Sequence, residues 1–380
     1  MIPIAKPLMG EQESALVAET IASGWVTQGP RVATFEENFA QQVGVAEAVA
    51  VSSCTAGLHL ALHAMGAGPG DEVITVSSSF IATANAIGYC GATPVFVDIE
   101  ADTLNMDVAL LEGAISAKTV GILAVHQLGM PCDLTAIKSI AEKHGLWLVE
   151  DAACAIGSEI EIDGAWRNIG HPVGAMAVFS FHPRKVLTTG DGGMITTNDT
   201  ELANRLRKLR QHGMDISDRE RHSAGRVIFE SYPEPGFNYR MTDIQAAVGI
   251  VQLTRLQGII AGRREIAERY HALFAKLPGV TPPHQPPWAR SNWQSYALRL
   301  PAGTEQKSVM NALLEQQVSS RRGVMCAHLE GAWPKERWRA GSSLSESQKG
   351  RDETIMLPIY PQMSPSEVEQ VVDGVRAVVR

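Results

Sequence analysis

The sequence predicts an α/β fold, with a large N-terminal domain on a mainly parallel sheet and a smaller C-terminal α+β domain. Between residues 48 and 153, short apolar runs alternate with helical patterns, which is typical of βαβ units. A proline-rich segment of linker composition, LPGVTPPHQPPW, occupies residues 277 to 288. With 380 residues, of which 45% are hydrophobic and 19% charged, the chain has the composition of a folded protein and the length of about two domains. We predict a division into domains 1–255 and 256–380.

The first region supplies most of the expected sheet. Its expected strands are the apolar runs AVAVSS (48 to 53), DEVITVSSS (71 to 79), TPVFVDI (93 to 99), VGILAVHQLG (120 to 129) and LWLVEDAA (146 to 153). Its expected helices are LHLALHAM (58 to 65), FIATANAIGY (80 to 89), DVALLEGAI (107 to 115) and DLTAIKSIAEKHG (133 to 145). The last of these has an N-cap residue at Asp133 and a C′ glycine at Gly145.

The remaining elements follow in order. AVFSFH (177 to 182) and GGMITTN (192 to 198) predict two further strands, and a charged helix is expected from about Asp199 to Gln211. Thr242 with Gln245 forms a capping-box pattern that opens a helical stretch to about residue 276. This stretch is long for one helix, so we expect a bend at Gly258 or Gly262. A strand, SYALRL (295 to 300), and further helices complete the chain.

Charge and cysteine content exclude several classes of protein. The formal net charge of -8 argues against general nucleic-acid binding, and no apolar run approaches the ~18 residues needed to cross a bilayer. The start, MIPIAKPLMG, lacks the apolar run of a secretory signal, so we expect a cytoplasmic protein without a membrane partner. The five cysteines form no CxxC pair and indicate neither a disulfide framework nor a zinc site. An anionic substrate would need local cations, which could come from Arg31, Arg240, Arg321 and Arg322.

A histidine pair is the strongest metal candidate. His59 and His63 lie one helical turn apart, but HLALH lacks the glutamate of the HExxH motif. We therefore expect a packed or interface pair and no metal.

Three local patterns carry the chemistry. Lys185 in FSFHPRKVLTTGDGGM (179 to 194) could add to a carbonyl if its amine is desolvated beside cations, although a solvated loop lysine is the alternative. Asp151 follows Glu150 at the end of a buried-looking strand, where open α/β sheets keep their sites; a helix N-cap is the alternative. VSSCTAGLHLAL (51 to 62) is a strand, a small-residue turn and a helix start, which together aim backbone N–H groups at an anion. With the aromatic Phe80, these features meet the requirements of pyridoxal 5′-phosphate (PLP).

In these residues the chain resembles the DegT/DnrJ/EryC1/StrS family of sugar aminotransferases, which have the aspartate aminotransferase-like fold (fold type I). The resemblance runs nearly end to end, and the order and spacing of its blocks are specific. The blocks are GWVTQGPRVATFEENFA (24 to 40), SSCTAGLHLAL (52 to 62), DEVITVSSSFIATANAI (71 to 87), PVFVDI (94 to 99), VEDAACAIGS (149 to 158), FSFHPRKVLTTGDGGM (179 to 194) and GFNYRMTDIQAAVG (236 to 249).

The resemblance implies a role for each candidate residue. Lys185 matches the lysine that forms the internal aldimine, and Asp151 matches the partner of the protonated pyridine nitrogen. Phe80 matches the aromatic that stacks on the ring. Asn238 matches a residue that reaches the cofactor of the neighbouring subunit, which implies a homodimer with shared sites. The phosphate contacts match the backbone around Cys54 and Ala56 and the residues Thr55 and Ser180.

The chain departs from the family pattern at two positions. Cys154 stands where many relatives have Gln or His, which puts a hydrogen bond to the cofactor's ring oxygen in doubt, because a thiol is a weak donor. Arg184 stands where smaller residues are common, and either a substrate anion or a surface acid could be its partner. Candidate substrate contacts are His182, for which a structural role is the alternative, Arg240 and His328.

The resemblance implies a PLP-dependent aminotransferase with ping-pong kinetics. It would move an amino group from an amino acid, with L-glutamate expected, to a nucleotide-linked keto-sugar. One alternative is a sugar dehydratase, but relatives of that type replace the lysine with histidine. The other is a non-catalytic PLP-binding regulatory protein.

Overall fold

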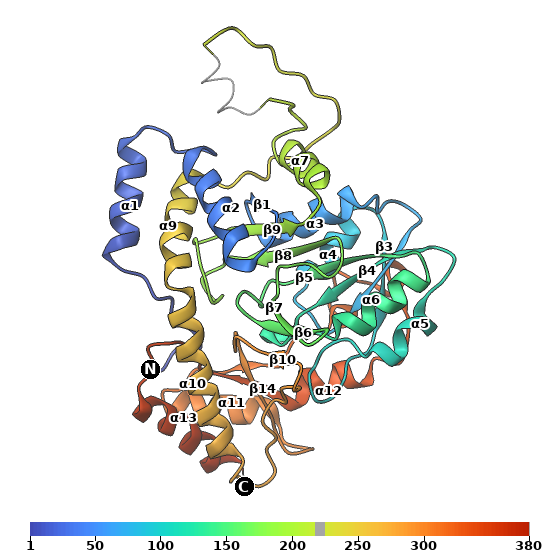
Figure 1. Ribbon diagram of the computed structural model, residues 1–380. Coiled ribbons are helices and arrows are strands. Elements are labelled where there is room, and N and C mark those ends of the chain that lie inside the picture. The colour runs from blue at the N-terminus through green and yellow to red at the C-terminus, as the bar shows by residue number, and fades with distance from the viewer. Residues whose placement is uncertain (217–224, 380) are drawn as a thin grey trace.

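The centre of the protein is an eight-stranded sheet (Figure 1). The computed structural model describes residues 1–216 and 225–379. The sheet order is β1-β9-β8-β5-β4-β2-β3-β13, and only the pairings of β9 with its two neighbours are antiparallel. The strands are β1 (Glu47–Val51), β2 (Glu72–Val76), β3 (Thr93–Val97), β4 (Thr119–Val125), β5 (Trp147–Asp151), β8 (Met176–Ser180), β9 (Gly193–Thr197) and β13 (Arg339–Ala340). The predicted α/β class and its mainly parallel sheet are confirmed.

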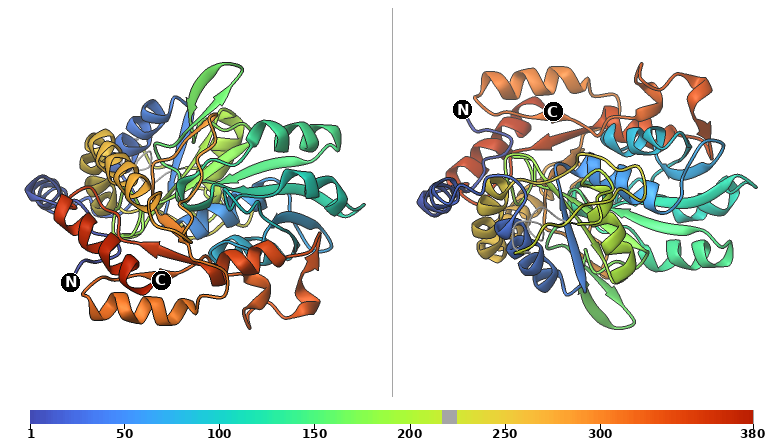
Figure 2. Two further views of the ribbon diagram at one scale, coloured as in Figure 1. Left: turned by 90° about the horizontal axis from the view of Figure 1, so that it is seen from below. Right: turned by 90° about the horizontal axis from the view of Figure 1, so that it is seen from above.

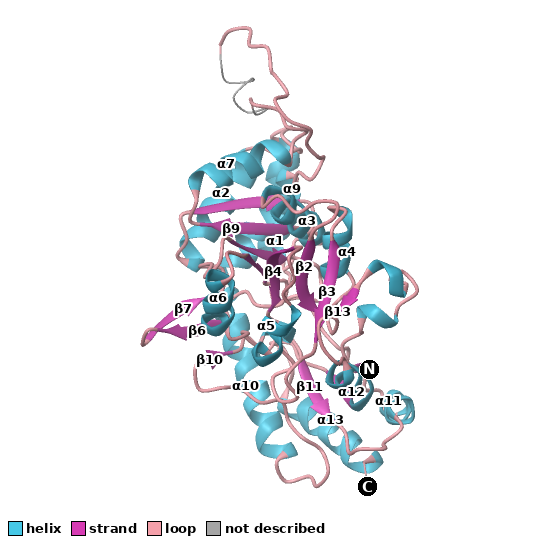
Figure 3. Ribbon diagram, turned by 90° about the vertical axis from the view of Figure 1, so that its right-hand side faces the viewer, coloured by secondary structure: helices cyan, strands magenta, loops and turns pink. Residues whose placement is uncertain are grey.

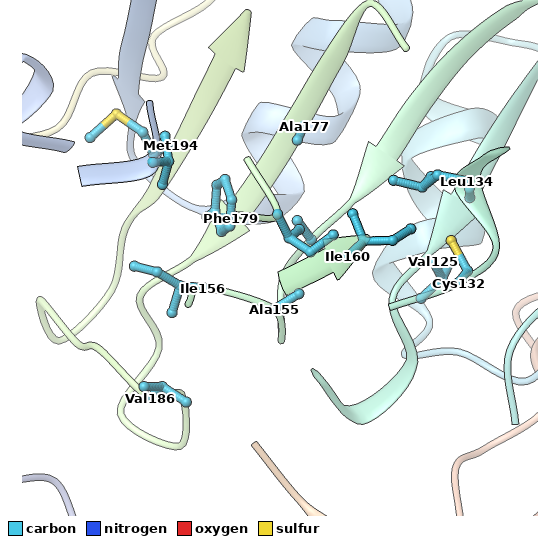
Figure 4. Packing of buried hydrophobic residues seen from close by; sticks show 14 of the residues in the cluster. Val125, Cys132, Leu134, Ala155, Ile156, Ile160, Ala177, Phe179, Val186 and Met194 are labelled. Atoms are coloured by element: carbon cyan, nitrogen blue, oxygen red, sulfur yellow. The ribbon is translucent and has the colours of Figure 1, made fainter. Parts of the chain in front are cut away.

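Helices cover both faces of this sheet, because successive strand side chains point to opposite sides. Leu148 of β5 belongs to the cluster that includes α2, α6 and α9, whereas the next residue, Val149, belongs to the cluster under α3, α4 and α7. Figure 4 shows part of the first cluster, from Met194 and Phe179 on the strands to Leu134 at the start of α6. The helices are α1 (Glu11–Ala22), α2 (Pro30–Val43), α3 (Cys54–Ala64), α4 (Ala82–Tyr89), α5 (Leu111–Ala114), α6 (Leu134–Lys143), α7 (Thr200–Leu209) and α9 (Asp243–Thr254).

A second hydrophobic cluster lies around a small antiparallel sheet of order β11-β14-β12. Its elements are α10 (Leu256–Phe274), β11 (Tyr296–Arg299), α11 (Gln306–Glu315), β12 (Arg321–Arg322), β14 (Thr354–Leu357) and α13 (Pro365–Val378); α12 (Ser345–Glu353) precedes β14. Ile2 belongs to this cluster and forms a bridge with Val318, so the N-terminus lies beside the C-terminal region (Figure 2). In the other direction, β13 joins the edge of the large sheet. The division at 255/256 stays a prediction. The N-terminal segment around Ile2 and strand β13 each pack on elements from the other side of this boundary.

The long helical stretch is broken, but not where we expected. It bends by 59° between α9 and α10, at Arg255, rather than at Gly258 or Gly262. The N–H of Arg255 bonds to the carbonyl of Gln252 at 3.1 Å, three residues back, and this tighter turn ends α9. Gly258 lies in open space, so its missing side chain meets no packing requirement.

The sequence patterns did not predict a third, small sheet. It pairs β6 (Glu159–Ile162) with β7 (Ala165–Asn168) and with β10 (Ala289–Arg290), which directly follows the proline-rich segment. Figure 3 shows the β6–β7 hairpin projecting from the side of the molecule. Within the described residues, no single helix is long and apolar enough to cross a membrane, and only the bent pair of α9 and α10 together reaches that measure.

Candidate active site

The predicted site residues gather at one edge of the large sheet. β2, β5 and β8 run parallel, so their carboxyl ends meet there. Asp151 is the last residue of β5, Ser180 is the last residue of β8, and Phe80 lies in the loop after β2. Cys54 opens α3, and its thiol interacts electrostatically with Asp151, Lys185 and Cys154. Segments distant in sequence therefore form one site.

Asp151 is buried and held by two hydrogen bonds. The residue is only 4% exposed. Its Oδ2 accepts a hydrogen bond from the Thr83 hydroxyl at 2.8 Å, and its Oδ1 accepts one from the Ala153 N–H at 3.1 Å. Burial raises the pKa of Asp151 above its ordinary value, and these two hydrogen bonds oppose that rise. Residues 152 to 158 form turns rather than a helix, so the N-cap alternative is wrong.

Glu150 has a structural role on the opposite face of β5. Its fully buried carboxylate accepts from the Val173 N–H at 2.7 Å and lies 3.3 Å from Nε2 of His126. Nδ1 of His126 accepts from the Cys132 N–H, so Nε2 carries the hydrogen that is donated to Glu150. Adjacent carboxylates therefore serve different purposes.

Lys185 is half-buried, and its amine points into the site rather than into solvent. Nζ lies 3.0 Å from Sγ of Cys154, so the solvated-loop alternative is wrong. Burial lowers the pKa of Lys185, but the contact with Cys154 and the nearby Asp151 carboxylate raise it above its ordinary value. The amine therefore carries a proton in the cofactor-free protein, and it must lose that proton before it adds to a carbonyl.

The start of α3 forms a corner suited to a phosphate. Ser53 caps the helix by accepting from the Ala56 N–H at 3.2 Å, while the N–H groups of Cys54 and Thr55 lie in the first turn, where helices lack internal acceptors. Ser180 pairs in register with Gly193. A Cβ on Gly193 would lie 2.7 Å from the Cys54 nitrogen, so this glycine lets the end of β8 approach the helix start. The hydroxyls of Ser53 and Ser180 and the N–H groups of Cys54 and Thr55 thus border one corner.

Cys54 contributes its backbone rather than its thiol. Burial, followed by the Asp151 carboxylate, holds the pKa of the Cys54 thiol well above its ordinary value, so the thiol stays protonated near neutral pH.

Asn238 points away from this corner within its own chain. Its neighbours Phe237 and Tyr239 stack on each other with centroids 5.1 Å apart, and both pack against His59 of α3. Alternation along an extended segment sends the side chain between them to the opposite side, where Asn238 is exposed and accepts from Nε of Arg240 at 3.2 Å. The structure therefore leaves the amide accessible from outside the chain.

The histidine pair of α3 is packed as expected. His59 bonds through Nδ1 to the Tyr239 hydroxyl at 3.0 Å, and His63 packs edge-on against Phe237. Within residues 1–216 and 225–379, no group of three or more His, Cys, Asp or Glu side chains could hold a metal ion.

Two of the candidate substrate contacts are histidines with protein partners. Nδ1 of His182 accepts from the Arg184 N–H at 3.2 Å, which shapes the turn before Lys185. The Gln348 amide donates to Nε2 of His328 at 3.2 Å, so Nδ1 carries the hydrogen and donates to the Ser77 hydroxyl at 2.5 Å. His328 thereby lies against the loop that carries Phe80, although both its ring nitrogens are engaged.

The predicted cations are spread over different elements. Arg31 pairs with Glu19 at 3.3 Å at the start of α2, and Arg322 pairs with Glu330 at 3.4 Å beside the small sheet, next to Arg321.

Three residues that hold the site together were not predicted from the sequence. Asn292 donates to the Cys154 carbonyl at 2.8 Å, and Gln294 donates to the Arg184 carbonyl at 2.7 Å. Thr83 donates to Asp151 across 68 residues. Thr83 lies within the family block 71 to 87, but no local pattern singles out any of these three residues.

The residues present fit PLP. The α3 corner supplies N–H and hydroxyl donors for a phosphate, Asp151 supplies a buried carboxylate for a pyridine nitrogen, and Lys185 supplies an amine for an aldehyde. Phe80 is 64% exposed, so its ring is open to stacking, and its carbonyl accepts from the N–H of Thr83, which contacts Asp151.

Comparisons with known proteins agree with this chemistry. Residues 7–376 match the DegT/DnrJ/EryC1/StrS aminotransferase family. The chain is 39% identical over 383 residues to the spore coat polysaccharide biosynthesis protein SpsC of Bacillus subtilis, covering 100% of this chain and 97% of SpsC. Its structure resembles the aminotransferase TlmJ of Streptoalloteichus hindustanus, with a TM-score of 0.89, 37% identity and coverage of 99% and 98% of the two chains.

A third relative was solved with the cofactor. Spr1654 of Streptococcus pneumoniae, in its PLP form, superposes with a TM-score of 0.90 at 28% identity, covering 100% of this chain and 98% of Spr1654. The fold is therefore that of the PLP-dependent aminotransferases of fold type I. The chain belongs to the DegT/DnrJ/EryC1/StrS family and is a PLP-dependent sugar aminotransferase.

Proposed function

We propose that this enzyme transfers the amino group of L-glutamate to a nucleotide-linked keto-sugar, using Lys185 as its proton carrier. The observation that carries the proposal is the placement of the Lys185 amine, 3.0 Å from Cys154 and within electrostatic range of Asp151, at the carboxyl edge of the sheet. Such a desolvated amine can exchange a proton with a substrate carbon.

Each residue then has a defined task. PLP, when bound, supplies an electron sink for the donor's Cα. Asp151 would balance a positive charge on the pyridine nitrogen, while Thr55, Ser180 and the first N–H groups of α3 would hold the phosphate. Lys185 would act as the base toward the donor's Cα and hold the removed proton on its amine. For the keto-sugar, it carries the proton in the opposite direction, so donor and acceptor use one site in turn and the kinetics are ping-pong.

A substrate panel tests this function directly. Incubation of the PLP-loaded enzyme with L-glutamate and a set of keto-sugar nucleotides should convert one ketone to an amine, detected by mass spectrometry, with 2-oxoglutarate formed in equal amount. Free keto-sugars serve as the matched controls and should react at least about tenfold more slowly, because loss of the nucleotide removes binding energy worth more than about 1.4 kcal/mol. Equal conversion of free sugars would contradict the nucleotide-linked assignment.

We also propose that the active sites are shared within a homodimer. The exposed amide of Asn238, which points away from its own phosphate corner, supports this arrangement. Large apolar side chains in the described part of the segment between α7 and α9 also support it, because Val227 and Phe229 are 83% and 88% exposed. The described part of this segment extends beyond α7 (Figure 1).

Mixed dimers test the sharing of sites. Asn238→Asp should weaken PLP binding, because the new carboxylate would repel the cofactor phosphate, and Lys185→Ala should remove the proton carrier. Each variant alone should be a poor enzyme. When the two are unfolded and refolded together, mixed dimers should recover activity, because one of their two sites then has both native residues.

Native mass spectrometry should confirm that mixed dimers form. Refolding each variant with itself is the control and should restore nothing. If mixed dimers are present and activity stays at the level of the separate variants, Asn238 serves its own chain and the shared-site proposal is wrong.

A further inference from the structure

Two buried hydroxyls lie in line behind the Asp151 carboxylate. Thr83, the second residue of α4, is 1% exposed, and Ser79, in the preceding loop, is 4% exposed. The Thr83 hydroxyl lies 2.8 Å from Oδ2 of Asp151, and the Ser79 hydroxyl lies 2.7 Å from that of Thr83. The three groups form a chain of hydrogen bonds that is closed to solvent.

The charge of Asp151 dictates the direction of this chain. An ionised carboxylate can only accept, so the single hydrogen of Thr83 points to Asp151. Thr83 then accepts in turn, and Ser79 must be its donor. A protonated Asp151 could instead donate to Thr83, and the chain would reverse. The order Ser79 to Thr83 to Asp151 is therefore the arrangement that belongs to a charged carboxylate.

This charge needs support because the site is buried. Burial raises the pKa of Asp151, and the hydrogen bond from Thr83 is the largest influence in the other direction, ahead of the Ala153 N–H. The titratable groups that also interact with Asp151 are Lys185, His126 and Cys54. Cys54 stays protonated, so it does not supply a competing charge near neutral pH.

The loop that carries Ser79 is anchored by the C-terminal region. The Ser77 carbonyl accepts from the N–H groups of Ser79 and Ala327, both at 2.9 Å, and His328 donates to the Ser77 hydroxyl. Ser78 adds a carbonyl that accepts from the Gln127 side chain. These contacts fix the backbone of the loop that carries Ser79. The position of the Ser79 hydroxyl therefore does not depend on its side-chain rotamer alone.

We propose that Thr83, backed by Ser79, is a positioning residue that keeps Asp151 ionised and oriented toward the pyridine nitrogen of PLP. The inference rests on the proposed role of Asp151. It assigns Thr83 no contact with substrate, because the hydroxyl acts through the carboxylate.

The test replaces the hydroxyl while keeping the side-chain shape. Thr83→Val should weaken PLP binding to the cofactor-free protein by about tenfold or more, because hydrogen bonds to charged groups contribute more than neutral ones. The pH at which the Asp151 carboxyl protonates should also rise, as followed by infrared difference spectra of the cofactor-free protein against Asp151→Asn. Thr83→Ser keeps the donor. It should therefore restore the PLP affinity to within about twofold of wild type and return the protonation of the Asp151 carboxyl to the wild-type pH.

A matched control separates this role from packing. Thr75 is equally buried on β2, and its hydroxyl donates at 2.8 Å to the Leu123 carbonyl, a backbone acceptor rather than a carboxylate. Thr75→Val should change PLP affinity by less than about twofold, even if it lowers the melting temperature, because its hydroxyl supports no charge. If Thr75→Val and Thr83→Val weaken PLP binding equally, the effect is one of packing and the proposal is wrong.

A second background distinguishes failure of this proposal from failure of the Asp151 assignment. In Asp151→Asn protein, adding Thr83→Val should have less than about a twofold further effect, because the charge it supports is gone. If Asp151→Asn itself leaves PLP binding unchanged, the role assigned to Asp151 is wrong. If Asp151→Asn weakens binding but Thr83→Val does not, only the positioning role is wrong. Should Thr83→Val fail to fold, Ser79→Ala decides the question: it should weaken binding about two- to threefold in the wild-type background alone.

Discussion

Lys185→Ala is expected to lower the rate of amino transfer by about a thousandfold or more, because it removes the only proton carrier that we assign to the donor's Cα. The variant should still bind PLP through the α3 corner and Asp151, but without the absorption band of a lysine-linked cofactor. Stopped-flow spectra with L-glutamate and borohydride reduction followed by peptide mapping measure both effects.

A surface lysine provides the control for this experiment. Lys138 lies on α6, where its amine is 3.6 Å from Glu142, and its side chain is 46% exposed. Lys138→Ala should retain the band, the rate and the borohydride-labelled peptide containing Lys185. Attachment of the cofactor to a different lysine in the wild-type protein would show that Lys185 has been assigned wrongly.

Asp151→Asn should slow the first half-reaction on the order of a hundredfold or more, because an amide cannot balance a protonated pyridine in a buried site. The amide has nearly the same volume, and its oxygen can still accept one of the two hydrogen bonds from Thr83 and Ala153. Folding should therefore stay close to that of wild type. The rate of conversion of bound PLP by L-glutamate, measured in a single turnover, is the decisive quantity, and a value within threefold of wild type would contradict the assigned role.

The neighbouring carboxylate supplies an unusually close comparison. Glu150→Gln changes the adjacent residue of the same strand, whose carboxylate accepts from the Val173 N–H and from His126. Replacing one carboxylate oxygen with an amide group sets two donors against each other, so the melting temperature should fall while the half-reaction continues. If Glu150→Gln slowed the half-reaction while Asp151→Asn only lowered the melting temperature, the roles assigned to these two carboxylates would be the wrong way round.

Local patterns in the sequence were sufficient for most helices and strands and for the main site residues. Asp133, Asp199 and Thr242 cap α6, α7 and α9 through bonds to residues three positions ahead. Such signals work because donor and acceptor lie within one turn of the chain. The βαβ alternation of residues 48 to 153 likewise depends on neighbouring residues, and it correctly predicted the parallel strands up to β5, which ends at Asp151.

Contacts between distant segments could not be derived in this way. The break at Arg255 replaced the expected glycine bend, because helix ends depend on backbone bonds and packing as well as on residue type. β13, with two residues, carries no strand signal of its own and forms only because the edge of β3 is available. The β6–β7–β10 sheet likewise depends on Ala289 and Arg290, two residues that directly follow the proline-rich segment of linker composition and carry no strand signal of their own.

By itself, the sequence determined that this chain forms an α/β protein and places Lys185 and Asp151 in family motifs, because those signals lie in short stretches of residues. Only the tertiary structure decided that Asp151 turns toward the site while Glu150 turns toward His126, and that Thr83 meets Asp151 across 68 residues. The reason is physical: side-chain alternation puts adjacent residues on opposite faces of a strand, but strand order and helix packing decide what each face meets.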